Sequence, residues 1–302
     1  MTKKSGNWLI LFLLIPTAVI LAIVGLLIFQ ELQPLPPIQP LPNPNGYNAL
    51  VRAGEMVSSN SWNYDGLSQE ELRKTVENNA NALQLARSGL QQECRVPLQF
   101  SKDYSSNQIY RLIALRMLVP AFVAEGKLAE KENRFSDAAR TYLDTIHLGN
   151  EVSRGGVVID EMVAITIESY GLQPLQKLPD HLDAKSCRET IKALETFDAK
   201  RQSWADVLQQ ETIWERRTFS NLRILVFKLL YHSTKERSCQ RCVDTIKSTQ
   251  KKQGQLLIDL AARAYELEKG RRPASLAELV PDYLKAVPQD PVSGTNMVYS
   301  PR

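Results

Sequence analysis

The longest apolar run of the chain, WLILFLLIPTAVILAIVGLLIF from Trp8 to Phe29, constrains the fold most strongly. At about 1.5 Å per residue, a helix of this length would measure roughly 33 Å, enough to cross the hydrocarbon core of a bilayer. Two lysines precede the run, so the positive-inside rule places residues 1–7 in the cytoplasm. We therefore expect residues 8–29 to form a single transmembrane helix that acts as a signal anchor in the lipid bilayer. A cleaved signal peptide is the alternative, but its apolar part is usually only about 7–15 residues long.

The segment after this run is rich in proline. QPLPPIQPLPNPNG, residues 33–46, contains six prolines. Because proline fixes φ and favours polyproline II, we expect residues 30–46 to be a semi-rigid stalk, with a disordered spacer as the alternative. In both interpretations the segment is a linker, and the folded domain begins near Tyr47.

The composition limits what the rest of the chain does. Of the 302 residues, 43% are hydrophobic and 23% charged, as in ordinary globular proteins. The net charge of +4 arises from 37 basic and 33 acidic residues without a basic block interleaved with aromatics. The charge pattern therefore gives no support to nucleic-acid binding.

Residues 47–254 have the apolar spacing of a mainly α-helical domain. Ser68 and Glu71 have the spacing of a capping box at the start of one helix. Further helices are expected at residues 157–172, 182–200, 203–232 and 240–269. The polar HSTKERS run is expected to separate the last two of these helices. The pattern leaves open whether these helices form a compact bundle or a superhelix.

One stretch, residues 119–150, resembles a single tetratricopeptide repeat hairpin. Small residues on such a hairpin let two helices cross closely, and aromatic side chains fill the groove beside them. We find no second convincing copy of the repeat. The resemblance rests on Phe122, Gly126, Ala129, Asn133, Phe135, Ala138 and Tyr142.

Residues 255–302 combine a long helix with an irregular tail. The helix is expected to end at Gly270, a residue suited to a left-handed cap. Ser275 and Glu278 have the spacing of a capping box at the start of a helix of one or two turns. Proline and Ser-Gly turns follow, and residues 296–300 are expected to be a short β-strand or an extended segment that folds back on the last helix.

The tail contains a set of spaced residues that recur in one known family: Gly270, Arg272, Pro273, Ser275, Leu276, Glu278, Leu279, Asp290, Pro291, Gly294 and Tyr299. On these residues it resembles the C-terminal part of the major pseudopilins of type II secretion. In that family a membrane helix leads to a soluble domain, so the resemblance implies a bacterial envelope protein. The N-terminal signature of the family, an apolar helix opened by Phe with a glutamate five residues in, is absent, because Gly6 is followed by Asn7 and Trp8. The resemblance therefore extends to the tail fold and not to the filament role or the calcium site.

CQRC, from Cys239 to Cys242, is a motif with potential redox chemistry. Outside the cytoplasm such a pair could form a structural disulfide or a redox-active one. Its neighbours are polar and helical rather than a strand followed by a helix, which favours a structural disulfide. A zinc site would need two further ligands at suitable spacing.

Two sets of polar residues are candidates for catalysis or metal binding. Asp144, His147 and Glu151 share one helical face and could hold a metal or combine a base with an orienting acid. The alternative is a solvated helix face. Glu161 and Glu168, seven residues apart, could act as the paired carboxylates of a glycoside hydrolase, or form the polar edge of a buried helix.

No nucleotide-binding or hydrolase motif is present in the sequence, and we expect no cofactor. The main hypothesis is a non-enzymatic scaffold or accessory protein, anchored in the bacterial inner membrane, whose extracytoplasmic helical domain binds an envelope protein partner. An envelope enzyme that uses the carboxylate or Cys residues is one alternative. A divergent pseudopilin-like secretion component is another.

Overall fold

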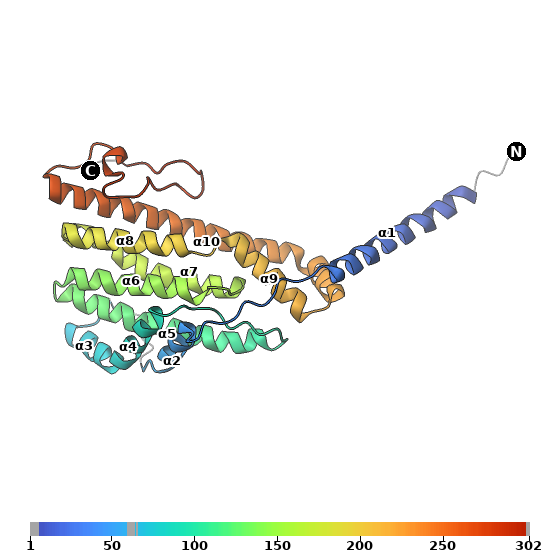
Figure 1. The fold of residues 1–302 in the computed structure, drawn as a ribbon, viewed down its shortest axis with the longest axis horizontal. Coiled ribbons are helices and arrows are strands. Elements are labelled where there is room, and N and C mark those ends of the chain that lie inside the picture. Colours follow the sequence, from blue (N-terminus) through green and yellow to red (C-terminus); the bar gives the residue numbers. More distant parts are fainter. Residues whose placement is uncertain (1–5, 59–63, 65, 300–302) are drawn as a thin grey trace.

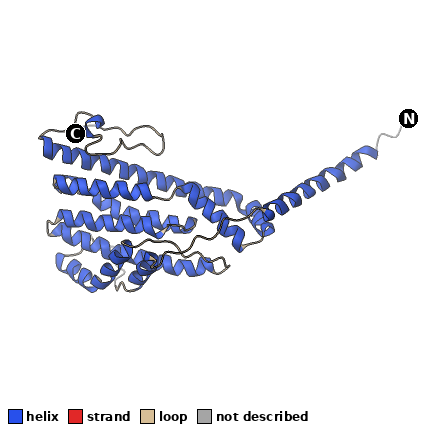
Figure 2. Ribbon diagram, in the orientation of Figure 1, coloured by secondary structure: helices blue, strands red, loops and turns tan. Residues whose placement is uncertain are grey.

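The computed structural model describes residues 6–58, 64 and 66–299, and this part of the chain is mainly helical (Figures 1 and 2). Within it, no β-strand is formed. Short 3-10 helices lie at Pro179–His181 and Leu276–Leu279. The α-helices are α1 (Gly6–Leu32), α2 (Gly46–Glu55), α3 (Gln69–Asn78), α4 (Ala80–Leu90), α5 (Tyr104–Lys131), α6 (Phe135–Val152), α7 (Val158–Leu175), α8 (Ala184–Lys200), α9 (Trp204–Thr218) and α10 (Asn221–Lys269).

Helix α1 projects away from the rest of the molecule (Figure 1). Across the residues described, however, the structure contains no helix with the length and apolar character needed to cross a membrane. The expected transmembrane helix and signal anchor at residues 8–29 is therefore wrong. This finding does not bear on cellular location, so the expected extracytoplasmic position stays a prediction.

Helices α5 to α8 and α10 form the body of the domain (Figure 1). Helix α6 packs against α5 and α7, and α8 packs against α6 and α10. Because short turns connect α5 to α6 and α6 to α7, successive helices are antiparallel, and α5 and α7 run in the same direction. One cluster of buried apolar side chains joins α2, α4 and α5 to α6 and α7, and a second joins α6, α7, α8, α10 and the tail.

Helices α5 and α6 form the hairpin that contains residues 119–150. The turn between them places Asn133 in the left-handed region, at φ 54°, and the Arg134 amide donates to the Ala129 carbonyl at 2.8 Å. The helices approach closely at Gly126, where a Cβ atom would lie only 2.3 Å from Cε1 of Tyr142. The small residue and the aromatic ring therefore meet across the hairpin. The resemblance to the tetratricopeptide family itself stays a prediction.

The helices after α8 differ from those expected. Helix α9 ends at Thr218, and α10 then continues without a break from Asn221 through the HSTKERS run to Lys269. The expected boundary near residues 232–240 is therefore wrong. Lysine, glutamate and arginine have good helix propensity, so the polarity of this run does not end a helix. At the other end, Gly270 takes the expected left-handed conformation at φ 69°.

The C-terminal tail is irregular rather than stranded. In the described part of the expected strand, only one isolated bridge forms, between Gln289 and Asn296. The Met297 side chain instead contacts α10, where a Cβ atom on Gly254 would lie 2.7 Å from its sulfur. The capping box predicted for Ser275 and Glu278 is also absent, because the Ser275 side chain makes no cap bond and Glu278 Oε1 accepts from the Ala274 amide at 3.2 Å.

We expect Gly54→Ala to destabilise the domain. A Cβ atom at this position in α2 would lie 1.9 Å from the backbone oxygen of Ala114 in α5, so the two helices would have to separate. The overlap should cost about 1–3 kcal/mol, against a gain of about 1 kcal/mol in helix propensity. A net loss of about 1 kcal/mol is therefore expected in urea unfolding followed by circular dichroism.

Gly66→Ala is the matched control, because no atom lies within 4 Å of a Cβ added there. Equal unfolding midpoints for the two variants would contradict the close packing of α2 on α5.

Candidate binding surface

Asp144 belongs to an ion-pair network between helices. Arg87 of α4 donates from Nε to Asp144 Oδ2 at 2.7 Å, and its other nitrogens bind Glu125 of α5. Burial raises the pKa of Asp144, and the Arg87 guanidinium opposes this shift. Asp144 therefore joins α6 to α4, and Arg87 connects both helices to α5.

His147 and Glu151 lie one turn apart on α6. His147 Nε2 is 3.5 Å from Glu151 Oε1, and the imidazole ring stacks on Phe197 of α8 with the ring centroids 4.6 Å apart. Arg154 Nε is 3.2 Å from the same oxygen of Glu151. The imidazole thus packs between two helices, and Asp144 makes its ion pair with Arg87 rather than with either residue.

Glu161 and Glu168 face the interior of the domain. Arg201, the residue that ends α8, donates to both oxygens of Glu168 at 2.9 and 2.8 Å. The pair is deeply buried, with 10% of the arginine side chain and 2% of the glutamate side chain exposed. Burial raises the pKa of Glu161, while the Ser153 hydroxyl and the Arg201 charge lower it. No local sequence signal marks Arg201 as the partner of Glu168, because the two residues are 33 positions apart in different segments.

A third buried carboxyl belongs to Asp160, near the start of α7. Its Oδ2 accepts the Val157 amide at 2.8 Å, and its Oδ1 accepts from Gln108 of α5 at 2.5 Å. Gln108 also donates to the hydroxyl of Tyr47 at 2.9 Å. Burial raises the pKa of Asp160 to about 7, although both hydrogen bonds act to lower it. This residue joins α7 to α5.

The other predicted sites do not converge. Within the described part of the chain, no group of three or more His, Cys, Asp and Glu side chains is placed to hold a metal ion. Cys239 and Cys242 are free thiols one turn apart on α10, and the disulfide between them stays a prediction. The predicted polar residues therefore tie helices together and do not enclose a substrate cleft.

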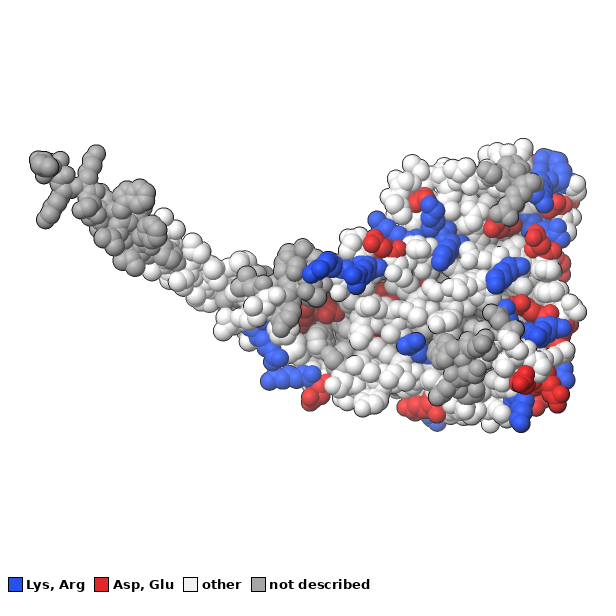
Figure 3. Space-filling model, turned by 180° about the vertical axis from the view of Figure 1, so that it is seen from behind, with Lys and Arg blue, Asp and Glu red and all other residues white. Residues whose placement is uncertain are grey.

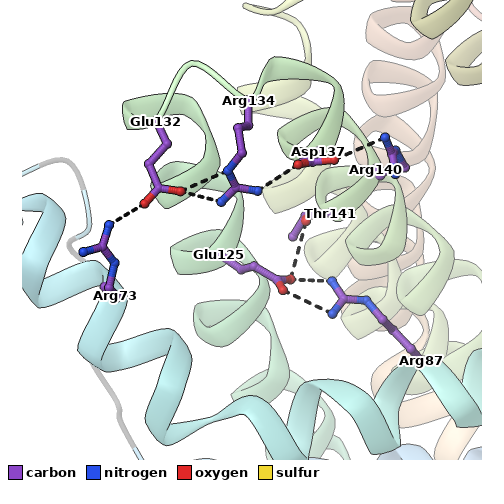
Figure 4. A network of polar contacts seen from close by, with 8 residues as sticks. All are labelled: Arg73, Arg87, Glu125, Glu132, Arg134, Asp137, Arg140 and Thr141. Atoms are coloured by element: carbon purple, nitrogen blue, oxygen red, sulfur yellow. Dashed lines mark hydrogen bonds and ion pairs between the residues drawn. The ribbon is translucent and has the colours of Figure 1, made fainter.

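A second network lies at the turn between α5 and α6 (Figure 4). Glu132 accepts from Arg73 at 2.7 Å and from Arg134 at 2.6 Å, and Arg134 also binds Asp137 at 2.8 Å. The Arg73 and Arg134 guanidinium groups lower the pKa of Glu132 to about 2. Exposed ion pairs of this kind typically contribute little stability, so this network is a solvated edge of the domain.

The exposed face formed by α5 and α7 is the surface best suited to binding. The two helices run in the same direction, and Gln108 of α5 faces Asp160 of α7. Ile109 follows Gln108 and Ile159 precedes Asp160, so both isoleucine side chains point to the same side of the helix pair. Residues spaced three or four positions apart along each helix point to this same side. We define the α5–α7 face by Ile109, Ile113, Arg116, Ile159, Val163, Thr166 and Tyr170.

Large apolar side chains on this face are open to solvent. The exposed fraction is 45% for Ile109, 51% for Ile113, 37% for Ile159 and 38% for Tyr170. Arg116 is the one charged residue among the seven positions. Seen from behind, the molecule shows uncharged surface over part of its middle, with charged side chains gathered at the end far from α1 and others beside the base of α1 (Figure 3). Exposed apolar surface of this kind is typical of protein interaction sites.

Comparison with known proteins identifies no relative. No protein family model matches the chain, and no curated protein or solved structure has significant similarity to it.

We expect Arg201→Met to unfold the domain at lower denaturant concentration. The substitution leaves the Glu168 carboxylate buried without its partner, a loss of about 3–5 kcal/mol for a buried pair. Arg188→Gln is the matched control, since it breaks the more exposed pair with Glu268 at 2.7 Å and should cost at most about 1 kcal/mol. Similar midpoints for both variants would contradict the central role of the buried pair.

The buried Asp160 carboxyl predicts a pH dependence of stability. Its folded pKa of about 7 lies above the unfolded value of about 3.9, so the folded state binds the proton more tightly. This group therefore stabilises the fold fully below about pH 4, and its contribution is lost as the pH rises to about 7. The Glu211 and Glu161 charges add to the rise, although less than burial does.

We expect the unfolding free energy of Asp160→Asn minus that of the natural protein, both measured in urea, to rise by about 4 kcal/mol from pH 4 to pH 8. Parallel pH profiles for the two proteins would contradict the raised pKa.

Proposed function

We propose that the protein is a non-enzymatic scaffold whose helical domain binds a partner protein at the α5–α7 face. The supporting observation is that two parallel helices present apolar side chains to solvent in matched rows. Exposed apolar side chains on two adjacent helices fit the apolar side of an amphipathic helix, a common mode of peptide recognition. The occupant that we propose is such a helix in the partner.

The buried carboxylates give less support to the enzyme alternative. Glu161 and Glu168 lie against Arg201 with only 5% and 2% of their surfaces exposed. A general acid or base must come within hydrogen-bond distance of its substrate, and these groups are enclosed by helices. The pseudopilin-like alternative rests on the tail alone.

Site-specific photo-crosslinking tests this proposal. A photoreactive phenylalanine analogue replaces Ile113 or Tyr170 in the full-length protein, and the crosslinked products are identified by mass spectrometry. Arg140 of α6 is the control position, because its side chain is 69% exposed and lies outside the α5–α7 face. We expect the same partner to be captured from Ile113 and Tyr170 and not from Arg140.

A charge on the face should then abolish capture. Ile113→Glu places a charge among apolar groups, and we expect it to reduce the crosslink formed from position 170 at least tenfold while circular dichroism is unchanged. Arg140→Glu should leave that crosslink intact. Capture that is equal from all three positions, or insensitive to Ile113→Glu, would rule out the α5–α7 face.

A further inference from the structure

A separate cavity lies beneath the proline-rich segment. We name residues 33–45 the strap, because they run as an extended chain from α1 back to α2 (Figure 1). Strap residues 36–41, the loop at residues 93–100 and one face of α9 enclose a cavity of about 700 Å³. This volume is within the usual range of ligand sites, about 300–1,000 Å³. It lies apart from the α5–α7 face.

The cavity has an excess of positive charge. Arg95, Arg154, Lys200 and Arg217 line it, against the two carboxylates of Glu93 and Asp206. The Asp206 carboxylate already accepts from the amide and hydroxyl of Ser203 at the start of α9, at 3.2 and 2.6 Å.

Two of these cations are the most available to a ligand. Among the described residues, no carboxylate lies within ion-pair distance of Lys200, and the same holds for Arg95. Arg154 is less available, because it pairs with Glu151 at 3.2 Å. The site can therefore supply several charge-assisted bonds to an anion.

The strap shows that this site already binds extended backbone. Arg216 donates to the Gln33 carbonyl at 3.0 Å, Arg217 donates to the Pro36 carbonyl, and Arg95 donates to the Gln39 side chain. Proline residues have no amide donor, and their carbonyls stay open to such donors. The strap side chains remain largely exposed, with Ile38 at 60% and Leu41 at 48%. The strap thus covers the cavity without filling it.

We propose that this cavity binds an acidic, extended peptide segment of a partner protein beside the strap. The acidic side chains would pair with Lys200 and Arg95. Carboxylate–guanidinium bonds are stronger than bonds to a neutral amide, so the ligand would draw Arg95 away from Gln39. Apolar parts of the segment would contact Leu98, Phe100 and Ile213, which also line the cavity.

Fluorescence anisotropy with the full-length protein tests this inference. The probes are a labelled peptide of eight glutamates, the same peptide with eight glutamines, and tripolyphosphate as a competitor. We expect the glutamate peptide to bind and the glutamine peptide not to bind. Arg95→Gln and Lys200→Gln should each weaken binding at least threefold, and Lys192→Gln, an exposed lysine of α8 outside the cavity, should not.

Gln39→Ala separates a binding defect from misfolding. It removes the strap partner of Arg95, so it should strengthen binding of the glutamate peptide two- to threefold, a gain that a damaged fold could not produce. Binding insensitive to Arg95→Gln and Lys200→Gln would overturn the proposal. Binding of tripolyphosphate without the glutamate peptide would overturn it too, in favour of a small-anion site. The proposed function at the α5–α7 face is tested separately.

Discussion

The ion pair between Glu168 and Arg201 is the interaction on which the arrangement of the domain depends. It joins the middle of α7 to the end of α8, and the same guanidinium reaches Gln253 of α10 at 3.4 Å. Two residues after Arg201, Ser203 begins α9. The pair therefore fixes both α7, which carries half of the α5–α7 face, and the start of α9, which forms a wall of the cavity. Each proposed binding surface rests on this contact.

Buried polar groups hold the two ends of the face in different ways. Removing a carboxylate from water costs several kcal/mol, which a buried residue recovers only through close hydrogen bonds. Glu168 recovers it with two bonds from a guanidinium, whereas Asp160 accepts bonds from an amide and from Gln108 and has a raised pKa. Such groups set the register of α7 against its neighbours. These buried carboxyl groups act by holding helices in place rather than by transferring protons to a ligand.

The sequence predicted what local physics decides. The helical content followed from apolar spacing, the capping box of Ser68 and Glu71 is present, and Gly270 takes the expected left-handed cap. Contacts between distant segments were out of reach, because Arg201 has no local signal that marks Glu168 as its partner. In its described part, the predicted strand does not form. The Met297 side chain packs on α10, and within the described residues there is no neighbouring strand with which this segment could pair. Asp144 is separate from His147 and Glu151 because it pairs with Arg87 of α4, whereas His147 and Glu151 lie 3.5 Å apart on α6.

The strap changes the meaning of the proline-rich segment. As a stalk, it would act only through its length. In the structure, arginine side chains bind it at Gln33, Pro36 and Gln39, so it is part of the domain surface. Because the strap begins where α1 ends, these hydrogen bonds and the contacts of α1 with α10 together hold the end of α1 beside the domain.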